Sequence, residues 1–252
     1  MAFPTVPTTA DGRILGNNQA NTTATRTFPN LSGLTKASGD LLIAIVVAYQ
    51  TSTGTNAAFS GWTAGWTEFC DRATSTTCAI GAAYKWSTGS ETGTITVTQA
   101  GTITGHASMI VMSIPGAHAT TPPEAGTAAT GAGTAAPPAL DPAGWGTEDT
   151  LWIAVNVNGE TSTTGSWTAN NGAPANYTDY FGTNPPDSSI LGQVGGAVAF
   201  RQLNAASENP GAFSQDTTNA RNTAVTFAVR PAPDAVAPYI AMAPQVPYSS
   251  SV

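Results

Sequence analysis

The stretch GDLLIAIVVAY, residues 39–49, is answered further along the chain by EDTLWIAVNVN, residues 148–158. Both stretches join an acidic residue to an apolar run with Ile-Ala at its centre. Three further segments recur in the same order: GWTAGWTEF (61–69) with SWTANNGAPANYTDYF (166–181), IGAAYKWSTGSETG (80–93) with VGGAVAFRQLNAASENPG (194–211), and ASMIVMSIPG (107–116) with TAVTFAVRP (223–231). Matches in one order at a nearly constant offset indicate an internal duplication.

The repeated segments have the hydrophobic pattern of β-strands. Val225, Phe227 and Val229 alternate with small or polar residues, which is the period of a strand with one buried face. The continuous apolar run 41–47 instead predicts a strand that is covered on both sides, or one at the centre of a sandwich. Gly, Pro and Asn mark frequent turns, and no segment has a convincing helical period. Each copy would contain about five strands and expose an apolar face, which pairing of the copies would cover.

We therefore predict an all-β protein, a jelly-roll-like β-sandwich with an internal pseudo-repeat and extended N- and C-terminal arms. A short edge strand is expected within PALDP (138–142) of the crossover, which otherwise should have no core of its own. The predicted parts are an N-terminal arm (1–9), the sandwich (10–231) with repeat one (about 36–116), a crossover (117–147) and repeat two (about 148–231), and a Pro-rich tail (232–252).

Charge and hydropathy narrow the classes of partner. Only 9% of the residues are charged, the net charge is −7, and the eight Lys and Arg residues are scattered. A nucleic-acid or anionic-membrane partner would require clustered cations, so neither is expected. The longest apolar run, 41–49, is too short to span a bilayer, and the N-terminus has no basic segment followed by an apolar one. We expect neither a membrane segment nor a signal peptide.

Residues for catalysis or metal binding are sparse. The chain has no nucleophile-elbow, zinc-protease or phosphate-loop motif, and its two histidines lack ligand spacing. Paired carboxylates could hydrolyse a glycoside in principle, and the candidates are Glu68 with Asp71, or Asp179 with Asp187. Acids at strand ends and turns are usually solvated. We therefore predict that the protein is not an enzyme and binds no cofactor or metal.

The two cysteines, Cys70 and Cys78, flank a short segment between two expected strands. A disulfide between them would clip a hairpin and contribute about 2–3 kcal/mol through loop closure. Two unpaired thiols are the alternative, and the sequence leaves both open.

Aromatic residues gather in corresponding loops of the two copies. Trp62 and Trp167 each begin a Trp-Thr pair, and their duplication favours core positions at the two ends of the sandwich. Trp66 has no clear counterpart, which makes it the better candidate for an exposed contact. Flat aromatic rings stack on sugars, so Trp66, Tyr177 and Tyr180 are the candidate glycan contacts.

The tail after residue 231 has a Pro every few residues and cannot form a helix. An extended, polyproline-like path is expected for it. Its large apolar residues are candidate contacts with neighbouring proteins in an assembly: Tyr239, Ile240, Met242, Val246 and Tyr248.

Several motifs together resemble a known class of protein. They are Gly-Asp-Leu-Leu-Ile-Ala (39–44), Gly-Trp-Thr (61–63), Ala-Ala-Tyr-Lys-Trp (82–86) with Ser-Glu-Thr-Gly (90–93), and an apolar strand that ends in Pro-Gly (115–116). This pattern resembles structural proteins of tailed bacteriophages, most of all the minor tail proteins of actinobacterial phages. The likeness spans residues 36–231, and it identifies a scaffold, with no catalytic residues to carry over.

The resemblance implies a virion protein that is made in the host cytoplasm and works on the particle. Its partners would be other virion proteins of the tail or capsid, further copies of itself in a homo-oligomer or multi-copy assembly, and a host cell-surface glycan. A minor tail protein is the first expectation. A capsid decoration protein of the same fold and a glycan-binding module are the alternatives.

Overall fold

The computed structural model describes residues 1–7, 13–18, 24–49, 59–73, 78–100, 107–132, 136–160, 172–182, 193–214 and 221–234. The regular structure of these residues is β-strand, apart from one short 3-10 helix, η1 (Leu31–Gly33). The strands form three antiparallel sheets, and the prediction of an all-β sandwich is confirmed. The narrower jelly-roll description stays a prediction.

The two large sheets each belong to one half of the chain, and a smaller sheet joins the first half. In the first sheet the order is β1-β8-β3-β6-β5, and in the second it is β10-β14-β11-β13-β12 with β9 also on β14. The third sheet has the order β2-β7-β4. The bounds are β1 (Arg13–Asn18), β2 (Thr25–Asn30), β3 (Ser38–Tyr49), β4 (Phe59–Ser60), β5 (Thr67–Ala73), β6 (Cys78–Thr88), β7 (Thr94–Gln99), β8 (Ala107–Ile114), β9 (Glu124–Ala125), β10 (Ala129–Ala132), β11 (Glu148–Glu160), β12 (Thr178–Gly182), β13 (Gln193–Ala205) and β14 (Arg221–Val229).

The two large sheets repeat each other in register as well as in order. Ala44 of β3 lies opposite Ala83 of β6, and Ala154 of β11 lies opposite Ala199 of β13. These are the residues that the sequence repeats align. On the other side of the central strands, the pairs Ile43–Met112 and Ile153–Phe227 also correspond. The duplication in sequence is therefore a duplication of strand pairing.

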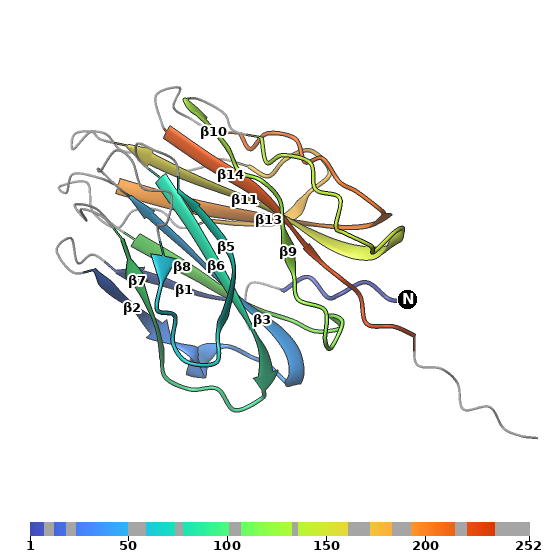
Figure 1. Ribbon diagram of the computed structural model, residues 1–252, viewed down its shortest axis with the longest axis horizontal. Coiled ribbons are helices and arrows are strands. Elements are labelled where there is room, and N and C mark those ends of the chain that lie inside the picture. Colours follow the sequence, from blue (N-terminus) through green and yellow to red (C-terminus); the bar gives the residue numbers. More distant parts are fainter. Residues whose placement is uncertain are drawn as a thin grey trace, which may run out of the picture.

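The two large sheets pack against each other (Figure 1), and the contacts between them set their strands in opposite order. Strand β6 contacts β11 and β14, while its counterpart β13 contacts β3 and β8. Because each contact in one direction has its equivalent in the other, an approximate two-fold axis relates the two halves.

One apolar cluster fills the space between these sheets and contains residues of both halves. Side chains alternate along a strand, so every second residue of each long strand points inward. Most of these inward residues are at most 1% exposed, and they are large aliphatic or aromatic groups. The cluster includes Leu41, Ile43, Ile45 and Val47 of β3, Ile110, Met112 and Ile114 of β8, Leu151, Ile153 and Val155 of β11, Val198 and Phe200 of β13, and Val225, Phe227 and Val229 of β14.

The third sheet covers the outer face of the first. Its inward residues Phe28, Ile95 and Val97 pack against Leu42 and Val46 of β3, so β3 is buried on both faces, as its continuous apolar run predicts. Phe59 approaches so closely that a Cβ on Gly81 would lie 2.5 Å from its ring, a distance that explains the glycine.

The crossover covers the outer face of the second sheet. Leu140 and Trp145 are buried there against Trp152, in a cluster of its own. Strands β9 and β10 pair with β14, and Leu140 forms an isolated bridge with Glu208. The prediction that the crossover lacks a core is therefore wrong, because repeat two has no described counterpart of the third sheet and its outer face needs another cover.

The N-terminal segment lies at one end of the sandwich (Figure 1). The Thr5 amide donates to the Pro115 carbonyl at 2.8 Å, and Gln202 Nε2 donates to the Pro4 carbonyl at 2.8 Å. Val6 packs against the shared core. The segment thus contacts both halves of the chain.

The shared core predicts that the two halves unfold together. We expect Ile43→Ala and Ile153→Ala, at equivalent positions, each to lower the free energy of unfolding by about 2–5 kcal/mol because each leaves a cavity in the same cluster. Urea denaturation followed by circular dichroism and tryptophan fluorescence should give one coincident transition for each variant. Thr94→Ala, at an exposed position, is the control. Two separated transitions would contradict a common core.

Candidate functional site

The candidate contact Trp66 has a structural counterpart after all. The Trp66 amide donates to the Thr63 carbonyl at 3.2 Å, and the Tyr177 amide donates to the Pro174 carbonyl at 3.0 Å. In both turns the residue before the aromatic has a positive φ, 88° at Gly65 and 67° at Asn176. Glycine and asparagine are the residues that tolerate this conformation at the third position of a turn.

The strands that follow these turns also match. Thr67 lies opposite Tyr84, and Thr178 lies opposite Phe200, which is the equivalent of Tyr84. Both strands then shift register at the same point, within a bulge. Ala-Gly-Trp-Thr (64–67) and Ala-Asn-Tyr-Thr (175–178) carry this relation in the sequence. The relation is hidden in the sequence because repeat two has extra residues between its Trp-Thr pair and the turn.

Burial corrects one of the predicted glycan contacts, Tyr177. Tyr177 is 7% exposed, packs in the cluster under the crossover, and its hydroxyl donates to Glu208 Oε1 at 3.5 Å. Burial, together with the negative charge of Glu208, raises the pKa of the Tyr177 hydroxyl. Trp66 is half-buried against the cluster under the third sheet. A buried ring offers no face to a sugar, so Tyr177 is not a glycan contact; the side chain of Tyr180 lies outside the described residues.

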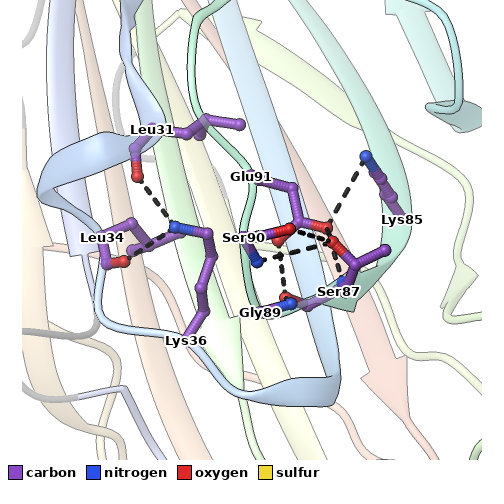
Figure 2. Close-up of polar contacts among 9 residues, drawn as sticks. Leu31, Leu34, Lys36, Lys85, Ser87, Gly89, Ser90 and Glu91 are labelled. Carbon is purple, nitrogen blue, oxygen red and sulfur yellow. Dashed lines mark hydrogen bonds and ion pairs between the residues drawn. The ribbon is translucent and has the colours of Figure 1, made fainter.

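In the turn that follows β6 lies a buried carboxylate, Glu91, whose side chain is 4% exposed. It accepts hydrogen bonds from the Thr88 amide at 2.6 Å, from Ser87 Oγ at 2.8 Å and from Thr88 Oγ1 at 3.0 Å. Lys85 Nζ lies 3.7 Å from it (Figure 2). Burial acts to raise the pKa of Glu91, but the hydrogen bonds outweigh it and lower this pKa to about 2. The carboxylate therefore stays charged and holds the turn after β6.

Figure 2 also shows Lys36 beside this turn. Its ammonium donates to the Leu31 and Leu34 carbonyls at 3.1 Å each, and so caps the end of η1. The lysines on this side of the molecule thus serve backbone and turn geometry.

The second half repeats the ion pair. Arg201 aligns with Lys85 and Glu208 with Glu91, and Arg201 Nη1 lies 2.7 Å from Glu208 Oε1. The cation is 28% exposed in one pair and 27% in the other, and both carboxylates are nearly buried. Because the pair recurs wherever the fold recurs, we assign it to the scaffold.

A further ion pair has no equivalent in repeat one. Arg230 donates through Nε and Nη2 to both oxygens of Glu148, which lowers the pKa of Glu148. The guanidinium lies 5.9 Å from the centre of the Trp145 ring, within the range of a cation–π contact. This pair fastens the crossover to the end of the second sheet.

The paired carboxylates Glu68 and Asp71 share one face of β5 only because of the bulge. Glu68 lies opposite Ala83 and Asp71 opposite Gly81, two residues apart on β6. Glu68 Oε2 accepts from Trp62 Nε1 at 2.8 Å, and Asp71 Oδ2 accepts from the Phe59 amide at 3.4 Å.

The electrostatics of this pair differ from those of Glu91. Desolvation raises the pKa of Glu68, the Trp62 hydrogen bond opposes that rise, and the negative charge of Asp71 adds to it. Gly182 stands where repeat two would have the second carboxylate. The acidic pair is therefore a feature of repeat one alone. Of the other predicted pair, Asp187 lies outside the described residues.

The structure contains Cys70 and Cys78 as buried thiols that form no disulfide. Cys70 lies opposite Ala82, so the two cysteines are separated by four residues along the β5–β6 ladder, about 13 Å. A disulfide needs Cα atoms within about 7 Å. The register of β5 on β6 therefore rules out a disulfide between the two cysteines. Burial raises the pKa of the Cys70 thiol to about 12.

The candidate assembly contacts of the tail, from Tyr239 to Tyr248, lie outside the described residues, as does Trp167. Within the described part, no group of three or more His, Cys, Asp or Glu residues is arranged to hold a metal ion. No helix found there has the length and hydrophobicity to cross a membrane. Comparisons with protein-family models, curated proteins and solved structures gave no match.

The low pKa of Glu91 makes its contribution to stability depend on pH. The folded-state value of about 2 lies below the ordinary value of about 4.3, so the stabilisation is present above about pH 4.3 and is lost as the pH falls toward 2. We expect Glu91→Gln to lower the free energy of unfolding by about 1–3 kcal/mol at pH 7 and by little at pH 2. Urea titrations across this range measure it, with Asp141→Asn on the exposed crossover as control. An unchanged difference between variant and wild type at pH 2 would contradict the assignment.

The separation of the cysteines predicts two thiols in the purified, unreduced protein. Neither should react with Ellman's reagent at pH 8 in the folded state, because both are buried and the pKa of Cys70 is far above that pH. Both should react after unfolding in guanidinium without reductant. Recovery of thiols only after reduction would show a disulfide and a different β5–β6 register.

Proposed function

We propose that this chain is a structural protein of a bacteriophage virion, most directly a minor tail protein, and that it has no catalytic activity. One observation supports the proposal above the others. The residues of the resemblance build the scaffold: Asp40 to Ala44 form the start of the central strand, Lys85 pairs with Glu91, and the same pair recurs as Arg201 with Glu208. Motif residues that stabilise two packed sheets are what a structural building block requires.

The location of the charges agrees with such a role. The nearly buried carboxylates of the described ion pairs each face a cation, at Lys85, Arg201 and Arg230. A protein loses much stability when one partner of a buried ion pair is removed, so these residues have a structural role. Low charge and abundant hydroxyl groups on the surface suit close packing beside other proteins of a particle.

The proposal predicts that the protein is part of the particle. Phage particles purified from the host that produces this chain should contain it, as measured by mass spectrometry, and labelled antibodies should bind the tail in electron micrographs. Label on the head would favour the capsid decoration alternative. Absence from purified particles, with the protein present in the lysate, would overturn the proposal.

The tail provides a second arm of the experiment. A variant that ends at Asp234 keeps every described strand, and its folding can be checked by its urea midpoint. If the predicted contacts from Tyr239 to Tyr248 dock on neighbouring virion proteins, this variant should fold normally but enter particles several-fold less than the full chain. Normal incorporation would show that the tail has no docking role.

A further inference from the structure

Three aromatic side chains of repeat one form a row at the rim of the shared core. Phe69 of β5 and Tyr84 and Trp86 of β6 pack against the core and are each half-buried. The ring centres of Phe69 and Tyr84 are 6.2 Å apart, and those of Tyr84 and Trp86 are 6.3 Å apart, with edge-to-face geometry in both pairs. We call these three residues the aromatic row. Its exposed parts leave apolar ring surface in water, which a further segment can cover.

The equivalent positions of repeat two are closed by the N-terminal segment. Phe200, the counterpart of Tyr84, is 0% exposed. Gln202 stands in the place of Trp86 in the strand register, and its Nε2 donates to the Pro4 carbonyl at 2.8 Å. The two halves therefore differ at this rim, because the aromatic row of repeat one stays half-buried.

The start of the crossover is the counterpart of that N-terminal segment. The Thr5 amide donates to the carbonyl of the residue after β8 at 2.8 Å, and the His118 amide donates to the carbonyl of the residue after β14 at 2.9 Å. Val6 follows Thr5 and packs against the shared core, whereas Ala119 follows His118 and is exposed. An exposed alanine therefore stands in repeat one where a valine helps to close repeat two.

The tail leaves the sandwich close to the aromatic row. The Phe69 ring centre lies 5.0 Å from that of Phe227 in β14, and from Phe227 the described chain runs on to Asp234, at most about 25 Å away. The Ala232 amide bonds to the loop after β8, at the end of the sandwich where the N-terminal segment also lies (Figure 1). In a polyproline-like path, residues 235–252 would span about 56 Å, so the tail is long enough to turn back onto the row.

We propose that the aromatic row is the docking site of this chain's own tail, through residues 236–242, VAPYIAM. Proline-rich segments dock on aromatic-lined surfaces because their extended backbone is already close to its bound shape. Tyr239, Ile240 and Met242 supply the apolar cover that the exposed Ala119 does not. The contact forms in the isolated chain, so it goes beyond the proposed role of the tail on the particle.

Photo-crosslinking of the isolated full chain tests the proposal. The photoprobe benzoylphenylalanine is placed at Tyr239, the protein is irradiated at micromolar concentration, and mass spectrometry locates the cross-link. We expect a product of monomer mass in which the photoprobe is joined to the peptide that contains Phe69 or to the peptide that contains Tyr84 and Trp86. The same photoprobe at Val252 is the matched control and should give several-fold less of this product, because Val252 lies outside the docking segment.

Two variants test the residues of the contact with the photoprobe kept at Tyr239. Trp86→Gln introduces the residue of repeat two and removes one ring of the row, and its folding is checked by its urea midpoint. Ile240→Ser/Met242→Ser removes apolar groups of the tail and leaves every described strand unchanged. Each variant should lower the yield of the intramolecular product several-fold, whereas Val246→Ser should leave the yield unchanged.

Three outcomes would overturn the proposal. Products of dimer mass joined to the aromatic row would assign the row to contact between copies. Cross-links spread over the surface of the chain, or equal yields from the wild type and Ile240→Ser/Met242→Ser, would show that the row is not the docking site. Because the measurement uses the isolated protein, it can fail while the protein is found in particles, and it can succeed while the protein is absent from them.

Discussion

The fold depends on one constraint, which is that two sheets of equal design must bury the same apolar faces against each other. Equivalent residues such as Ile43 and Ile153 enter one cluster from opposite sides. An approximate two-fold axis makes this possible, because it brings β6 onto β11 and β14 while β13 meets β3 and β8. Neither half could leave its inner face in water without exposing a large apolar surface.

This central contact creates a second requirement, since the outer faces of the same sheets are also apolar. The two halves meet it differently. Repeat one uses the third sheet, with Phe59 close enough to require Gly81. Repeat two uses the crossover, with Trp145 and Leu140 buried on Trp152. The symmetric part of the molecule is therefore its interior, and the two outer layers are where the halves differ. Single side chains also differ between the halves, as at the Glu68–Asp71 pair, where Gly182 stands in the place of the second carboxylate.

Two of the nearly buried carboxylates follow the duplication. Glu91 and Glu208 are nearly buried, and each has a cation beside it at an equivalent position. A carboxylate in such surroundings is tolerable only when hydrogen bonds and an opposite charge compensate for lost water. The Ser87–Glu91 turn satisfies this through its own hydroxyls and amide. Motif residues that look chemically active in the sequence thus serve to close turns.

By itself the sequence determined the all-β class and the duplication, because hydrophobic periodicity and repeated motifs are local properties of the chain. Only the tertiary structure decided whether the cysteines can form a disulfide, which aromatic side chains are buried, and where the crossover packs. The register of β5 on β6 keeps Cys70 and Cys78 apart, and no spacing in the sequence shows a register shift. The burial of Tyr177 depends on the crossover residues packed over it, which are distant in sequence. Burial and register arise from contacts between distant segments, so composition and spacing cannot supply them.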